Sequence, residues 1–120
     1  MPQQRNPAKP YSRAHRGTLG SRQALVDLPA GGCRLPVPSM PDGRTWSAHE
    51  KSRWQELWKS PQANQWDETA RGTVACLVIF ETAIFTGSAS AWQAQEARYA
   101  AEALGLTPRS LVALGWRISE

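Results

Sequence analysis

Apolar side chains recur every three to four residues from residue 45 onward, which is the spacing of one face of an α-helix. Ser47 and Glu50 have the spacing of a capping box, in which each side chain satisfies a backbone N–H at a helix start. Trp54, Leu57 and Trp58 then follow at i, i+3 and i+4 and make one apolar stripe. These residues predict a first helix that begins after Ser47 and ends near residue 59.

Two further helix starts are predicted within ten residues of the end of the first helix. Ser60 and Pro61 are typical of a cap followed by proline at the first helical position, and they predict a short helical turn through Trp66. Asp67 is a suitable cap for a second long helix. That helix should end near residue 86, because Gly87 can adopt the left-handed conformation that commonly closes a helix.

The second long helix is more apolar than one small bundle can cover. Its large side chains fall on more than one face, so some should remain open to another subunit. The β-branched residues of the 74–79 stretch also permit a strand, but the flanking helical pattern favours the helix. We therefore predict an oligomer interface on this helix, formed by Leu77, Val78, Ile79, Phe80, Ile84 and Phe85.

The last third of the chain predicts two more helices. Ser90 can cap a helix over residues 91–104, which is rich in strong helix formers and is followed by Gly105. Thr107 and Pro108 then begin a short helix over residues 109–117. The predicted fold class is all-α: a small bundle of three to four helices with a central αα-hairpin.

Residues 100–111 also have the pattern of a helix-turn-helix. Small and apolar residues stand where two helices would pack around a tight turn at Gly105. The functional interpretation places Arg109, Ser110 and Arg117 of the second helix in a DNA major groove. The alternative is a corner that packs the C-terminus onto the body, since few residues here are suited to reading bases.

The first 44 residues have a different composition. Seven of the nine prolines lie there, together with several glycines, and large apolar residues are few. Such a segment cannot offset the entropy of ordering, so we expect an extended or disordered tail in residues 1–44 and a helical domain in residues 45–120. Residues 35–41 should form a stiff connector, because proline restricts itself and its predecessor.

The positive charge is concentrated in the predicted tail. The chain has fourteen Lys and Arg against ten Asp and Glu, a formal charge of +4, whereas residues 46–120 are close to neutral. Such segregation favours a polyanionic partner, although a tail that only aids solubility remains the alternative. The candidate DNA-phosphate contacts in the tail are Arg5, Lys9, Arg13, Arg16 and Arg22.

Several function classes find no support in the sequence. Cys33 and Cys76 have no paired spacing, so neither a disulfide framework nor a metal site is predicted. The chain lacks a phosphate-binding glycine loop, and His15 and His49 have no nucleophile beside them in a known motif. We predict a protein that is not an enzyme and needs no cofactor. With no apolar run long enough to cross a bilayer and no secretory signal, a cytoplasmic location is expected.

An ordered set of short motifs resembles the small terminase subunits of actinobacterial phages and prophages. A basic leader and a Pro-rich connector precede the first helix, as in those proteins. The most specific feature is the order of the motifs, which are Leu57-Trp58, Pro61-Gln62-Ala63, Glu96-Ala97-Arg98 and Leu104-Gly105-Leu106-Thr107-Pro108.

This resemblance implies a non-enzymatic helical protein that assembles into a ring and binds double-stranded viral DNA at the packaging start site. The ring would pass the DNA to the large terminase subunit, which carries out the chemistry, in the cytoplasm of the host cell. Which end of the chain contacts DNA stays open. Two alternatives also stay open: a helix-turn-helix transcription regulator that reads an operator with Arg109 and Ser110, and a phage structural or connector protein that binds no DNA.

Overall fold

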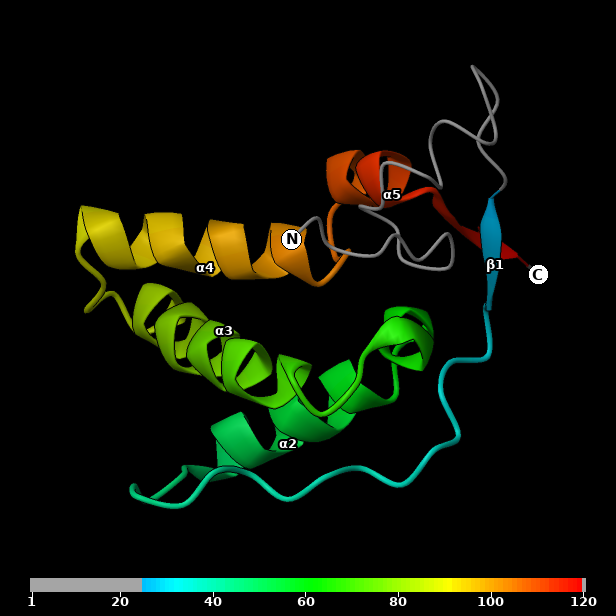
Figure 1. The fold of residues 1–120 in the computed structure, drawn as a ribbon. Helices are drawn as coiled ribbons and strands as arrows, with labels where there is room; N and C mark the ends of the chain where they lie inside the picture. Colours follow the sequence, from blue (N-terminus) through cyan, green and yellow to red (C-terminus); the bar gives the residue numbers. More distant parts are fainter. Residues whose placement is uncertain (1–24, 120) are drawn as a thin grey trace, which may run out of the picture.

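The computed structural model describes residues 25–119 and is mostly helical (Figure 1). Within these residues the chain forms four α-helices, one 3₁₀-helix and two short strands. In chain order they are β1 (Val26–Pro29), α2 (Ala48–Trp58), the 3₁₀-helix η1 (Pro61–Gln65), α3 (Ala70–Phe85), α4 (Ala91–Ala103), α5 (Pro108–Leu114) and β2 (Trp116–Ser119).

The capping pattern at the start of α2 is confirmed. The hydroxyl of Ser47 accepts a hydrogen bond from the backbone N–H of Glu50 at 3.1 Å, and the backbone N–H of Ser47 donates to the Glu50 carboxylate at 2.9 Å. Ser90 forms the same arrangement at the start of α4, and Thr107 does so at the start of α5. Each cap satisfies backbone N–H groups that the first helical turn leaves without a partner.

Helices α3 and α4 form the predicted antiparallel hairpin, with α2 packed on the other side of α3 (Figure 1). Gly87 has a φ of +75° just after α3, as expected for the residue that closes a helix. Helix α3 begins at Ala70 instead of directly after Asp67. The Asp67 carboxylate accepts a hydrogen bond from the Thr69 N–H at 2.9 Å, so Asp67 stabilises a turn ahead of the helix.

The main core lies where α2 and α3 meet. Its central side chains are each 3% exposed or less, and they are Trp54, Leu57, Val74, Leu77 and Val78. Two of them, Leu77 and Val78, were predicted for the subunit interface. The Trp54 and Trp58 rings lie 5.7 Å apart between centroids, and Trp58 meets Trp66 edge to face at 5.2 Å. Aromatic pairs in these geometries add to the stabilisation from burial.

The chain is not all-α, because β1 and β2 form a parallel two-stranded sheet that pairs Val26 with Trp116 and Pro29 with Ser119. The sheet covers a second small core around Leu28. The last helix was predicted to continue to residue 117, but it ends at Leu114. Gly115 adopts a φ of +74° and turns the chain out of the helix, so the following residues are free to pair as a strand.

Residues 30–46 are here called the strap. Residues 30–44 of the strap lie within the region predicted as a tail and connector, yet the strap packs along the helices. The backbone N–H of Cys33 donates to the Lys59 carbonyl at 3.0 Å, and the Trp54 indole N–H donates to the Pro38 carbonyl at 2.8 Å. The backbone carbonyls of an extended segment are not used in helical hydrogen bonds. They can therefore accept the hydrogen bond that a buried indole N–H requires. Of the predicted tail, residues 25–44 therefore belong to the packed body, and residues 1–24 lie outside the described part of the chain.

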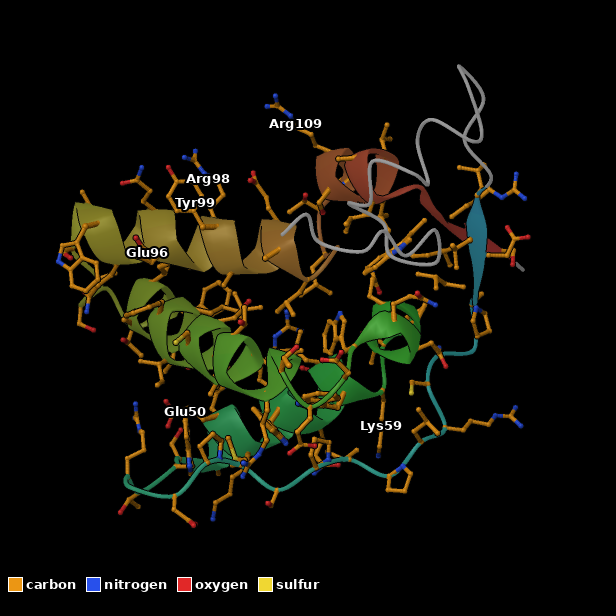
Figure 2. The ribbon with its side chains drawn as sticks, viewed as in Figure 1. Glu50, Lys59, Glu96, Arg98, Tyr99 and Arg109 are labelled. Atoms are coloured by element: carbon orange, nitrogen blue, oxygen red, sulfur yellow. The ribbon has the colours of Figure 1, made fainter. Side chains whose placement is uncertain are left out.

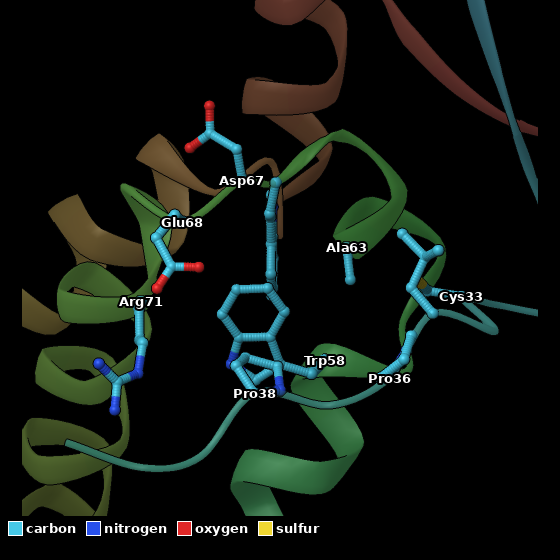
Figure 3. A pocket seen from close by; sticks show the side chains of 10 residues that line it. Cys33, Pro36, Pro38, Trp58, Ala63, Asp67, Glu68 and Arg71 are labelled. Carbon is cyan, nitrogen blue, oxygen red and sulfur yellow. The ribbon is translucent and has the colours of Figure 1, made fainter.

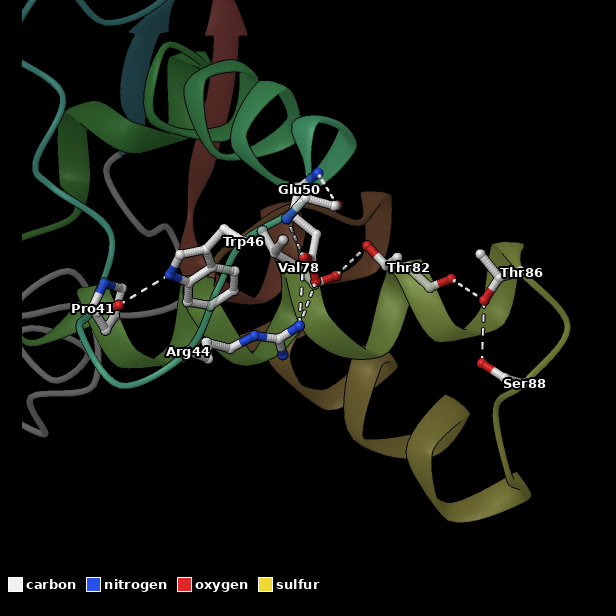
Figure 4. A network of polar contacts seen from close by, with 9 residues as sticks. Pro41, Arg44, Trp46, Glu50, Val78, Thr82, Thr86 and Ser88 are labelled. Carbon is white, nitrogen blue, oxygen red and sulfur yellow. Dashed lines mark hydrogen bonds and ion pairs between the residues drawn. The ribbon is translucent and has the colours of Figure 1, made fainter.

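The end of the strap is fastened to the start of α2 by a polar network (Figure 4). Arg44 donates to the Glu50 carboxylate at 3.2 Å, and the Trp46 indole N–H donates to the Pro41 carbonyl at 3.0 Å. The Glu50 side chain is almost fully buried, so its charge depends on Arg44 and the Ser47 N–H for compensation. This network fixes the direction in which the chain enters the first helix.

Candidate functional site

The residues predicted to read a DNA groove do not come together on one surface. Ser110 is buried, and its hydroxyl is engaged with Thr107 at the start of α5. Arg117 lies on β2 instead of a helix, and its guanidinium pairs with Asp27 of β1 at 2.8 Å. Arg109 is exposed on α5. Of the three predicted helix-turn-helix contacts, Arg109 alone is therefore exposed on a helix, and the predicted groove-reading set does not come together.

Two exposed residues on α4, Arg98 and Tyr99, were not identified from the sequence. Arg98, Tyr99 and Arg109 project from the sides of α4 and α5 that face away from α3 (Figure 2). The Arg98 guanidinium lies over the Tyr99 ring at 5.5 Å from its centroid. Glu102 is half-exposed on the same face of α4, so the face carries both signs of charge. The helical repeat could have revealed this group, since residues 95, 98, 99 and 102 share one face.

The predicted oligomer interface divides into buried and exposed parts. Leu77 and Val78 are 3% and 0% exposed within a single copy, so they belong to the core and are removed from the interface. Ile79 and Phe80 are half-buried. Ile84 and Phe85 are exposed, Phe85 to 72%. Every helix of this bundle needs one face for its own core, and the Leu77 and Val78 face of α3 serves that purpose.

The exposed apolar residues continue onto α4. Trp92 is 59% exposed, and its ring meets the half-buried Phe80 ring edge to face at 5.7 Å. We call Phe80, Ile84, Phe85 and Trp92 the hairpin tip. The sequence between Glu81 and Glu96 contains no charged residue, a signal that could have added Trp92 to the predicted interface. Isolated exposed apolar residues are ordinary, whereas large exposed apolar patches mark interaction sites, so the hairpin tip is a candidate surface only.

The charges of the helical body compensate one another. Residues 25–119 contain nine Lys and Arg and nine Asp and Glu, which leaves five of the fourteen basic residues and a single acidic one, Glu120, for the rest of the chain. Arg53 of α2 donates to the Glu81 carboxylate of α3 at 2.7 Å and also pairs with Glu56. The hydrogen bond from Arg53 to Glu81 raises the Arg53 pKa and outweighs the effect of partial burial.

The predicted tail contacts Arg5, Lys9, Arg13, Arg16 and Arg22 all lie outside the described residues. They are the five basic residues that the body does not balance, and residues 1–24 contain no Asp or Glu. The sequence therefore places the whole surplus of positive charge before β1.

A pocket of about 140 Å³ lies between the strap and the helices (Figure 3). The strap contributes Cys33, Pro36 and Pro38, and the helical side contributes Trp58 and Trp66. Asp67, Glu68 and Arg71 stand at its rim. The sequence did not indicate this pocket, because residues 35–41 were expected to form a stiff connector within an extended or disordered tail.

Known chemistry and known relatives give no assignment. Within residues 25–119, no group of three or more His, Cys, Asp or Glu side chains is placed to hold a metal ion. No helix in the described part of the chain is long and apolar enough to cross a bilayer. No family model, no curated protein and no solved structure matches the chain. The function must therefore be argued from the distribution of charge and apolar surface.

Proposed function

We propose that this chain is a DNA-binding adaptor of the terminase small-subunit type, which holds double-stranded viral DNA for a large terminase subunit that carries out the chemistry. The observation that carries the proposal is the segregation of charge: a body with equal numbers of acidic and basic residues follows a segment with five basic residues and no acidic one. The ordered motifs shared with small terminase subunits support the same assignment.

In this proposal the N-terminal cations bind phosphates without reading bases. Each phosphate contact releases a counterion, so the logarithm of the binding constant falls with the logarithm of salt by about 0.9 per contact. Five contacts give a slope of about −4.5, which is a loss of roughly 500-fold in affinity between 50 and 200 mM salt. The N-terminal segment that carries these five cations is here called the arm. A single arm binds DNA weakly, whereas several arms held together in one assembly bind it well.

Self-assembly supplies the additional arms. The hairpin tip is the apolar surface of the described body best suited to contact another copy, since Phe85 and Trp92 are largely exposed and no charge lies between Glu81 and Glu96. A closed ring of copies in the cytoplasm of the host would present its arms to one duplex, with the large terminase subunit as its protein partner. The hairpin tip replaces the interface that included Leu77 and Val78.

The test compares two full-length variants with the same change in charge. The first replaces Arg5, Lys9, Arg13, Arg16 and Arg22 by Gln, and the control replaces the exposed body residues Arg34, Lys51, Lys59, Arg98 and Arg117 by Gln. Binding to a duplex is measured by gel shift and fluorescence anisotropy over a range of salt concentrations.

We expect the first variant to lose most of the affinity and about four units of the salt slope, whereas the control keeps most of both. Equal losses in the two variants would remove the arm from the proposal. Absence of DNA affinity at low salt in the unaltered chain would favour a structural or connector protein. Protection of paired half-sites about one helical turn apart would instead indicate a transcription regulator.

A further inference from the structure

The parallel sheet leaves the outer edge of β2 without a partner strand. Backbone N–H groups of β1 and of the residue that follows it donate to the carbonyls of Gly115 and Ser119, both at 2.8 Å. Because backbone groups alternate between the two sides of a strand, the N–H and carbonyl groups of Trp116 and Ile118 point away from β1. Within residues 25–119, no hydrogen bond reaches these outward groups. They are therefore open to another strand.

The outer edge of β1, by contrast, is protected in the ways that are typical of an edge strand. Its outward positions are Asp27 and Pro29, and proline has no N–H to donate. A charged side chain and a proline both discourage the addition of another strand. The 3₁₀-helix η1 also contacts β1. The sheet is therefore protected at one edge and open at the other.

The side chain of Ile118 is an apolar group that the second small core leaves uncovered at the open edge. Ile118 pairs with Leu28 in the register of the sheet, so both side chains lie on one face. Leu28 is 1% exposed within this core, and Trp116 on the same face is 7% exposed. Ile118, however, is 41% exposed. A further strand beside β2 would cover it.

A ring of copies needs a second contact besides the hairpin tip. A surface that meets the same surface of another copy closes at a dimer, so tips that pair with tips join two copies and no more. Figure 1 shows the sheet at the end of the body opposite the α3–α4 turn, so a contact through β2 leaves the tip free. This step rests on the self-assembly in the proposed function.

We propose that β2 pairs antiparallel with β2 of a second copy, so that two small sheets become one sheet of four strands. In the register centred on Ile118, the Ile118 N–H of each copy donates to the Ile118 carbonyl of the other, and the two side chains meet on the core face. This register places no two like charges opposite each other. Sheets of three or more strands with an apolar face are stable where a two-stranded sheet is marginal.

The pairing brings the N-terminal arms of two copies together. Each arm leads into β1, and the two β1 strands are separated by three strand spacings of about 4.8 Å, or about 14 Å across the sheet. Arms that start this close can contact one duplex at the same time, which is the linkage that the proposed function requires. The pairing itself involves no DNA.

The test compares full-length variants by light scattering at millimolar protein concentration. Phe85→Ser removes the tip contact and should leave a dimer that is joined through β2. Ile118→Pro removes the outward N–H of β2 without removing a bond to β1, and should leave a dimer that is joined through the tips. Both changes together should give a monomer. Asp27→Pro, which removes an outward N–H from β1, is the matched control and should leave the mass of the assembly unchanged.

A second measurement needs no change in β2. In the Phe85→Ser chain, hydrogen exchange of the Ile118 amide should slow severalfold as the protein concentration rises, and exchange of the Asp27 amide should stay the same. A monomeric Phe85→Ser chain with Ile118 exchange that is independent of concentration overturns the proposal, and so does an Ile118→Pro chain that keeps the full mass of the assembly. A Phe85→Ser dimer that binds no DNA refutes the role of the arm and leaves the pairing in place, so the two failures are distinguishable.

Discussion

Replacing Gly105 by Ala should destabilise the body through a contact between the α4–α5 turn and β2. Gly105 has a φ of +75°, and a Cβ added to it would lie 2.2 Å from Cζ3 and 2.5 Å from Cε3 of Trp116. The turn cannot easily move away. The Gly105 carbonyl accepts a hydrogen bond from the buried Gln62 side chain at 3.0 Å, and the Leu104 carbonyl accepts one from the Trp66 indole at 2.9 Å.

Gly87 provides a matched control, because it has the same φ of +75° but nothing within 4 Å of an added Cβ. Gly87→Ala therefore measures the left-handed conformation alone, which costs Ala about 1–2 kcal/mol and is partly offset by about 0.4–1 kcal/mol through the unfolded chain. Gly105→Ala adds the displacement of a buried ring, which costs about 1–3 kcal/mol in overpacked cores. The difference between the two variants should thus be about 1–3 kcal/mol.

Urea unfolding followed by circular dichroism and tryptophan fluorescence gives both free energies. In thermal unfolding the same difference corresponds to roughly 4–24 °C for a domain of this size. If Gly105→Ala and Gly87→Ala unfold at the same urea concentration, the packing of Trp116 against the turn is refuted. If Gly105→Ala shifts the fluorescence transition to lower urea but leaves the circular dichroism transition in place, β2 and Trp116 separate while the helices stay folded.

Two other predictions concern the first cap and the hairpin tip. Ser47→Ala should lower the free energy of unfolding by about 1 kcal/mol, because the Glu50 N–H loses its acceptor. Ser52→Ala, on the exposed side of α2, should change it by less than about 0.5 kcal/mol. Urea unfolding of both variants distinguishes the loss of the cap from a general effect of replacing serine. Phe85→Ser should reduce the self-association measured by light scattering. Val112→Ser, at a position that is 80% exposed on α5, should leave self-association unchanged. If the unaltered chain is already monomeric, the hairpin tip is not an assembly surface.

The parts of the fold that depend on neighbours in sequence could be predicted. The Ser47 and Ser90 caps, the proline start at Pro61 and the glycine stops at Gly87 and Gly105 are set by contacts within a few residues. These local signals, together with the periodicity of the apolar residues, therefore predicted the helices of the body with small errors in length.

The pairing of distant segments could not be predicted. Residues 26 and 116 meet in the sheet although ninety residues separate them, and neither four-residue strand has enough alternation to identify it. The strap packs because Trp54 and Arg71 need the carbonyls of Pro38 and Ser39, a need that composition does not reveal. The candidate site was misjudged for the same reason: the roles of Ser110 and Arg117 depend on tertiary contacts.

The sheet also determines where the cationic segment is attached. Residues 1–24 lead into β1, which lies at the opposite end of the body from the α3–α4 turn that carries the hairpin tip (Figure 1). Copies joined through their hairpin tips would therefore leave the start of β1 uncovered in each. Phe85→Ser should then leave the affinity of a single copy for a short duplex unchanged and lower the affinity for a long duplex, because only the gain from several linked arms is lost. Equal losses on short and long duplexes would show that the tip itself contacts DNA.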